Sequence, residues 1–201
     1  MKLRVVTFFA ALVLFTSPVH AQIFRSAFGF SAVISDSWIV ISRETLAQNP
    51  GLIEYESNDF AGVDESTVAQ VRQMTESGRF EFLYHRHSDG DFQDNVNFFL
   101  SDPNPSNLAL ALQPLCDSLQ AQLQQAFNRT EFTTVHFCQQ GENPFIDMLV
   151  YSFDGAVIGT RSFGYVFNTS SGTVTMTLTC KVSKCEQVRP DAEKLFLELT
   201  I

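Results

Sequence analysis

The middle of the chain carries the clearest alternation of apolar and polar positions. Two stretches, residues 80–85 and 95–100, show the two-residue period of β-strands within RFEFLYHRHSDGDFQDNVNFFLS, residues 79–101. Between them lies SDGD, residues 88–91, a composition typical of turns. The pattern predicts a β-hairpin with a long tip, in the middle of a sheet that helices must cover.

The sequence of the last third of the chain predicts four successive β-strands. Four alternating stretches are separated by short segments rich in Gly, Asn, Asp and Ser; they span residues 131–139, 145–153, 157–168 and 173–182. Such short connections favour antiparallel neighbours. In the last stretch Val174, Met176, Leu178 and Cys180 alternate with threonines, which predicts one buried face. Near the amino end, residues 28–35 and 39–42 are expected to form short strands beside Trp38.

A helical period of three to four residues marks the remaining elements. The strongest helix is predicted by leucines at positions 108, 112, 115, 119 and 123. Residues 64–77 predict a second helix that stops at Gly78, and residues 43–48 predict a helical turn ended by Asn49-Pro50-Gly51. A closing helix is expected to begin at Arg189, with Pro190 in its first turn.

Residues 1–21 have the features of a secretory signal peptide. Lys2 and Arg4 give a basic start, an apolar run follows, and small residues precede Gln22, which places the expected cleavage after Ala21. A transmembrane anchor is the alternative, but the run is shorter than the roughly 20 residues that span a bilayer. We therefore expect an exported protein, periplasmic or extracellular, with one domain over residues 22–201 and no membrane span after cleavage.

The four cysteines are an even number, which favours two disulfides in an oxidising compartment. Three pairings are possible. Cys180 and Cys185 are close in sequence, so their loop costs little to close, and Cys116 with Cys138 would join a helix to the following strand. A zinc site is the weaker alternative because no CxxC spacing occurs.

The 201-residue chain has a net charge of −9. A charge of this sign makes nucleic acids and anionic membrane surfaces poor partners, because both are negative themselves. We expect instead an unknown protein partner in the cell envelope.

The tip of the central hairpin holds the main candidate metal ligands. His85 and His87 would project on the same side of a strand, which suits two imidazole ligands of zinc or copper, and Asp89 or Asp91 could complete the site. The alternative is an exposed polar tip with solvated carboxylates, since no third ligand is fixed by spacing.

No catalytic motif stands out. The sequence has no GxSxG, HExxH or GxxxxGK[ST] pattern, and cysteines in disulfides cannot act as thiol nucleophiles. His136 lies in an alternating stretch and is interpreted as a packed or edge histidine rather than a base. The expectation is a protein that is not an enzyme and needs no cofactor.

Several short motifs resemble the PsbP/Mog1-like superfamily over nearly all of the chain after residue 21. They are FGFS (28–31) followed by DSW (36–38), DNVN (94–97) and the ending LELTI (197–201). The resemblance implies an α+β fold, an α/β/α sandwich with a central antiparallel sheet flanked by helices. The four cysteines and the His-Arg-His tip depart from the family.

The resemblance also implies a non-enzymatic binding or accessory protein. Its photosystem members are extrinsic subunits that help retain inorganic ions, and Mog1 binds a small nuclear GTPase; neither role carries over to an exported chain without signs of photosynthesis. The function expected from the sequence is thus an exported accessory protein with an unknown ligand. The alternative is a metal-binding protein that uses His85 and His87.

Overall fold

A computed structural model of the chain describes residues 21–53, 65–86, 94–102, 108–126, 134–141, 148–154, 159–197 and 199–201. Its strands are β1 (Ala21–Arg25), β2 (Ser31–Ser35), β3 (Trp38–Ile41), β4 (Phe80–His85), β5 (Asn95–Ser101), β6 (Val135–Gln140), β7 (Met148–Asp154), β8 (Thr160–Thr169) and β9 (Gly172–Lys181). Its helices are α1 (Arg43–Gln48), the short 3₁₀ helix η1 (Pro50–Ile53), α2 (Glu65–Glu76), α3 (Leu108–Ala126) and α4 (Cys185–Leu197).

Seven strands form one antiparallel sheet in the order β3-β4-β5-β9-β8-β7-β6. The predicted central hairpin is confirmed as β4 and β5, and the run β6 to β9 is confirmed as antiparallel neighbours. The two groups of strands meet where β5 pairs with β9 over seven residue pairs, from Asn95–Thr179 to Ser101–Thr173. β5 and β9 are far apart in sequence, and their pairing joins the two groups of strands into one sheet.

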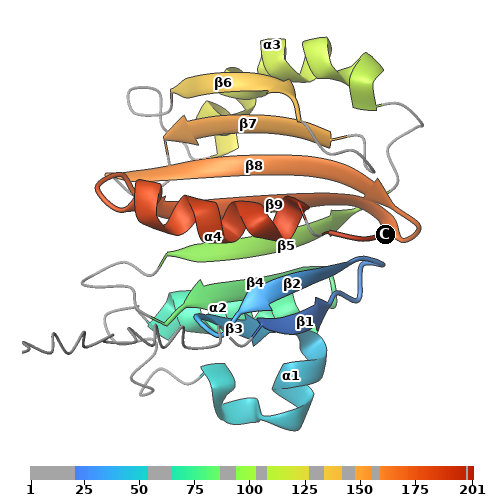
Figure 1. Cartoon of the computed structure of the whole chain (residues 1–201), viewed down its shortest axis with the longest axis vertical. Coiled ribbons are helices and arrows are strands. Elements are labelled where there is room, and N and C mark those ends of the chain that lie inside the picture. The colour runs from blue at the N-terminus through green and yellow to red at the C-terminus, as the bar shows by residue number, and fades with distance from the viewer. Residues whose placement is uncertain are drawn as a thin grey trace, which may run out of the picture.

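One face of the sheet is covered by α4 and by the small β1–β2 hairpin (Figure 1). The residues that alternate inward on β9, namely Val174, Met176, Leu178 and Cys180, are 0% exposed beneath this layer. The hairpin contributes Phe24 and Phe30, whose rings lie 5.6 and 5.1 Å from that of Phe98 on β5. This face therefore holds the main core, in which aromatic rings join the hairpin to the sheet.

The opposite face is covered at its two ends. Helices α1 and α2 pack with η1 against β3 and β4, around Ile41, Ile53 and Tyr84. Helix α3 packs against β6 and β7, where its buried Leu119 meets Tyr151 and Phe153. With helices on both faces of an antiparallel sheet, the described residues form the α+β sandwich expected from the sequence (Figure 1).

Two boundaries differ from the sequence-based expectation. Residues 28–30, expected to open a strand, lie in the turn between β1 and β2, where Gly29 takes a φ of +86° that L side chains rarely adopt. Helix α4 begins at Cys185 instead of Arg189, so Pro190 lies inside it. The extra turn forms because Cys185 is tied to Cys180 and Val188 packs into the core, and Pro190 then removes only one helical hydrogen bond.

No helix in the described part of the chain is long and apolar enough to span a membrane.

Candidate functional site

A cleft of about 460 Å³ opens beside the β1–β2 hairpin. This volume lies within the range of small-ligand pockets. Strand β1, the hairpin turn, the start of β2 and the last two residues of the chain line it: Ile23, Arg25, Ser26, Gly29, Phe30, Ser31, Thr200 and Ile201. We call these eight residues the hairpin cleft.

Alternation along β1 decides which side chains reach the cleft. Phe24 points inward and is 5% exposed, whereas its neighbours Ile23 and Arg25 point the other way and line the cleft. Ile23 is 64% exposed and Ile201 is 58% exposed, a high exposure for side chains of this size. The hairpin cleft therefore presents two apolar side chains and one cation to the surroundings.

The end of the chain is held to β2 by a short antiparallel bridge. The Ser31 N–H donates to the Thr200 carbonyl at 2.8 Å, and the Thr200 N–H donates to the Ser31 carbonyl at 2.9 Å. Leu199 beside them is 2% exposed and belongs to the core. These contacts place Thr200 and Ile201 beside β2 as a wall of the cleft.

Glu81, on β4, holds the hairpin turn to the sheet through hydrogen bonds. Its carboxylate accepts hydrogen bonds from the Ser26 hydroxyl at 2.5 Å and from the Ala27 N–H at 3.0 Å, and the residue is only 3% exposed. Burial raises the pKa of Glu81 above its ordinary value of 4.5, although both hydrogen bonds act in the opposite direction. Desolvation of the charged form therefore outweighs the gain from the two donors.

Replacing Glu81 by glutamine is expected to change how stability depends on pH. The raised pKa means that the wild-type carboxyl contributes stability below about pH 4.5 that is lost as pH rises through its folded-state pKa. Glutamine has no proton to lose and can still accept from the Ala27 N–H. The difference in free energy of unfolding, wild type minus Glu81→Gln, should therefore fall as pH rises. Urea denaturation of both proteins between pH 4 and 8 measures it. A constant difference would contradict this expectation.

The predicted metal-binding tip is only partly within the described residues. His85 ends β4, where its ring lies edge-on to Trp38 at 5.1 Å and its backbone N–H donates to the Asp94 carbonyl at 2.9 Å. His87, Asp89 and Asp91 lie outside the described residues. Within the ranges that the structure describes, no group of three or more His, Cys, Asp and Glu side chains is arranged to hold a metal ion.

Asp94, at the same end of the sheet as His85, is buried and has a structural role. It is 3% exposed and accepts a hydrogen bond from the Lys181 N–H at 3.1 Å, so it joins the start of β5 to the end of β9. Burial raises its pKa, against the opposing effects of that hydrogen bond and of His85, Lys184 and Lys181 nearby.

His136 lies in a row of polar side chains across the ends of three strands. It sits in an irregular stretch of β6, and its Nε2 is 2.7 Å from Asp154 Oδ1 on β7, which is 3.8 Å from Arg161 Nη2 on β8. All three side chains are about one-third exposed. Ser152 is 1% exposed and its hydroxyl does not hydrogen-bond to His136, so the geometry is that of a surface row of interacting polar side chains and not of a catalytic triad.

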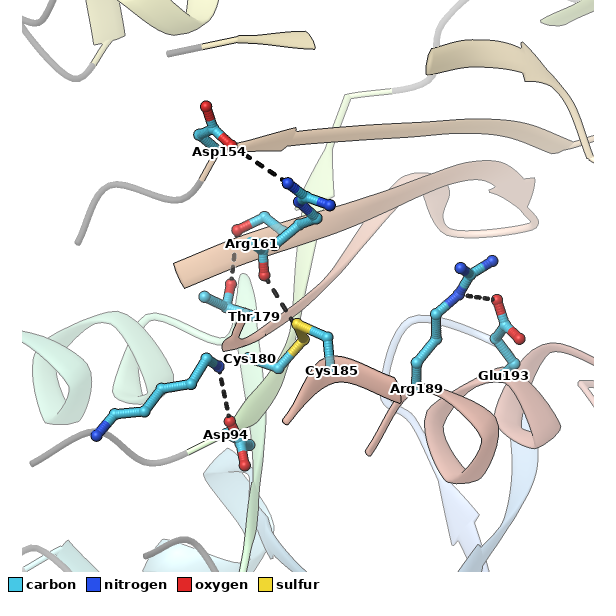
Figure 2. The surroundings of a disulfide bond; sticks show 10 residues. Asp94, Asp154, Arg161, Thr179, Cys180, Cys185, Arg189 and Glu193 are labelled. Atoms are coloured by element: carbon cyan, nitrogen blue, oxygen red, sulfur yellow. Dashed lines mark hydrogen bonds and ion pairs between the residues drawn. A yellow bond between two sulfur atoms is a disulfide. The ribbon is translucent and has the colours of Figure 1, made fainter. Parts of the chain in front are cut away.

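Both disulfides join elements of different type. Cys116 on α3 pairs with Cys138 on β6, and Cys180 on β9 pairs with Cys185 at the start of α4, which are the two pairs favoured by the sequence. Figure 2 shows the second disulfide beside the backbone carbonyl of Arg161, whose oxygen lies 3.7 Å from Cys180 Sγ, while the Arg161 side chain points away toward Asp154. One turn further along α4, Arg189 donates to Glu193 at 2.6 Å, an ion pair drawn in Figure 2. The Arg189 guanidinium also lies over the Phe163 ring, 4.8 Å from its centroid. This end of α4 is therefore fixed covalently and by a cation–π contact.

The hairpin cleft was not found by sequence reasoning. Strand β1 begins at Ala21, at the expected cleavage site, and its sequence AQIFR has no regular alternation of apolar and polar residues. The cleft also depends on Thr200 and Ile201, which lie more than 160 residues away in sequence and meet β2 only in the fold. Ile23 and Arg25, two positions apart in this segment, form no motif that would mark a site in the sequence.

No protein-family model matches the sequence, and no curated protein is significantly similar to it in sequence. The structure is similar to the solution structure of cyanobacterial PsbP (CyanoP) from Synechocystis sp. PCC 6803, with a TM-score of 0.54 and 8% sequence identity. The match covers 92% of this chain and 95% of that chain. At this identity the likeness concerns the fold alone: the chain has a PsbP-like fold, as its short motifs suggested.

Proposed function

We propose that this protein is an exported accessory protein that binds a partner protein at the hairpin cleft and does not transform it. The signal-peptide features of residues 1–21 and two disulfides support export to the periplasm or beyond, because disulfides persist in oxidising compartments. The negative net charge disfavours nucleic acid as the partner.

The hairpin cleft carries the proposal. It exposes Ile23 and Ile201 around Arg25 on a hairpin that is held rigidly by the buried Glu81 and by the aromatic contacts of Phe24 and Phe30. Exposed apolar side chains beside a polar rim are typical of protein-binding surfaces. A preformed site of this kind loses little conformational entropy on binding.

The test compares two aspartate substitutions at exposed apolar positions. Ile23→Asp places a charge in the hairpin cleft, and Val182→Asp is the matched control, because Val182 is 47% exposed in the turn after β9. Tagged protein is purified with its cross-linked partners from the exported fraction, and its intact mass should correspond to a chain that begins at Gln22. We expect at least a tenfold loss of the partner with Ile23→Asp and full retention with Val182→Asp. Equal recovery with both variants would refute the cleft as the binding site.

A further inference from the structure

The outer edge of β1 carries backbone groups that point away from β2. The Ser26 N–H donates to the Phe30 carbonyl at 3.0 Å, which makes residues 26 and 30 a hydrogen-bonded pair of the antiparallel hairpin. Because such pairs alternate along the strands, Phe24–Ala32 is the next one, and Arg25 and Ile23 belong to the pairs between. Their N–H and C=O groups therefore face outward. The backbone N–H and C=O of Ser31, which lies opposite Arg25, hydrogen-bond to Thr200 on the far side of β2. The Arg25–Ser31 pair is therefore not hydrogen-bonded across the hairpin, as this alternation requires.

Strand β1 is an edge strand in the described structure. It pairs with β2 alone, while β2 has α4 and Thr200 on its far side, so that β1 is the outermost element of this layer (Figure 1). Four of its five residues are exposed; only Phe24 is buried. A row of unpaired backbone groups on an exposed strand is a template for pairing with another extended segment.

The side chains beside this edge indicate which segment would fit. Ile23 and Arg25 are on the same face of β1, two positions apart, and Arg25 is the only ionisable side chain among the residues lining the hairpin cleft. In an added antiparallel strand, the residues directly opposite would pair with them on that face. An apolar residue opposite Ile23 and a carboxylate opposite Arg25 give the favourable cross-strand pairs.

We propose that β1 binds its partner by strand addition, with an extended segment that carries an acidic residue two positions before an apolar one. This rests on the proposed function, because it names how the hairpin cleft and its neighbouring edge recognise the partner. The backbone of Ile23 and Arg25 supplies hydrogen bonds, and their side chains select the sequence. This is the mode by which exposed sheet edges bind extended peptides.

The selectivity is tested with two synthetic peptides and a charge reversal. Ac-Thr-Glu-Val-Val-Thr-NH₂ places Glu opposite Arg25 and Val opposite Ile23, and Ac-Thr-Lys-Val-Val-Thr-NH₂ differs only in the charge. NMR titration of the full chain should show up to about tenfold tighter binding of the Glu peptide, from the size of cross-strand charge pairs. The variant Arg25→Glu should reverse the preference. Binding of neither peptide, or the same preference in both proteins, would overturn the proposal.

The backbone contribution is tested with two substitutions at one position. Ile23→Ala and Ile23→Pro both remove the branched isoleucine side chain, but only proline removes the outward N–H. Because that N–H points away from β2, the pairing of β1 with β2 is kept. We expect both variants to fold, with peptide binding weaker in Ile23→Pro than in Ile23→Ala. Equal binding would refute strand addition, even if Ile23→Asp loses the cellular partner and the hairpin cleft stands as the binding site. Self-association of the wild type through β1, detected by ultracentrifugation and abolished by Ile23→Pro, would overturn the acidic segment as the occupant.

Discussion

Replacing Phe98 by alanine is expected to lower the free energy of unfolding by about 3–5 kcal/mol, the usual cost of removing a buried phenylalanine. Phe98 is 1% exposed, and its ring packs against those of Phe24 and Phe30, which attach the β1–β2 hairpin to the sheet and also contact each other. The substitution leaves a cavity where the hairpin packs on β5. Urea denaturation of the purified variant measures the loss.

The next residue provides the control. Phe99 is on the same strand but points to the opposite face and is 43% exposed, so Phe99→Ala removes the same side chain with a smaller loss of buried area and no enclosed cavity. We expect Phe99→Ala to cost clearly less than Phe98→Ala, because Phe99 is partly solvated and its loss leaves no enclosed cavity. A similar loss in both variants would mean that the aromatic contacts of Phe98 do not hold the hairpin in place.

Removing the Cys116–Cys138 disulfide by a double alanine substitution is expected to cost about 3 kcal/mol. The bond closes a loop with a sequence separation of 22, and a cross-link limits the unfolded chain more as the loop grows. The Cys180–Cys185 bond has a separation of 5, for which the same relation gives about 2 kcal/mol. Denaturation of the two double variants, under oxidising conditions, measures both costs.

The matching check is the behaviour of the two variants in a reducing agent. Each variant keeps one disulfide, so dithiothreitol should lower its stability by the cost of the remaining bond and bring both to the same value. If reduction left the stability of wild type unchanged, the disulfides would contribute nothing to the fold.

Much of the architecture could be predicted because its signals are local. The alternation in residues 80–85 and 95–100 and the short connections between the last four strands depend on neighbouring residues, and the structure confirms the antiparallel pairing of both groups. The leucine period of residues 108–126 likewise marks α3, whose Leu119 is buried. Errors occurred where a local signal was overridden, as at Pro190, which helix α4 contains in its interior.

The candidate site could not be predicted in the same way. The sequence drew attention to His85 and its neighbours, which are rich in metal-binding side chains, whereas the cleft in the structure lies on the hairpin that covers the sheet. Its residues are ordinary ones: an isoleucine, an arginine, two serines and the end of the chain. They form a site because the fold brings them together, and their spacing along the chain does not indicate this.

Most strands and helices, and the buried face of the alternating strands, could be placed from the sequence alone, because the backbone period puts every second side chain of a strand, or every third to fourth of a helix, on one side. Strand β1, which lacks regular alternation, could not. The sequence also favoured the cysteine pairs that the fold contains. The pairing of β5 with β9, the support of the hairpin turn by Glu81 and the bridge from Thr200 to Ser31 are seen only in the folded chain. These contacts join residues at least 54 positions apart, so they arise from the packing of whole elements and from the burial of their shared core.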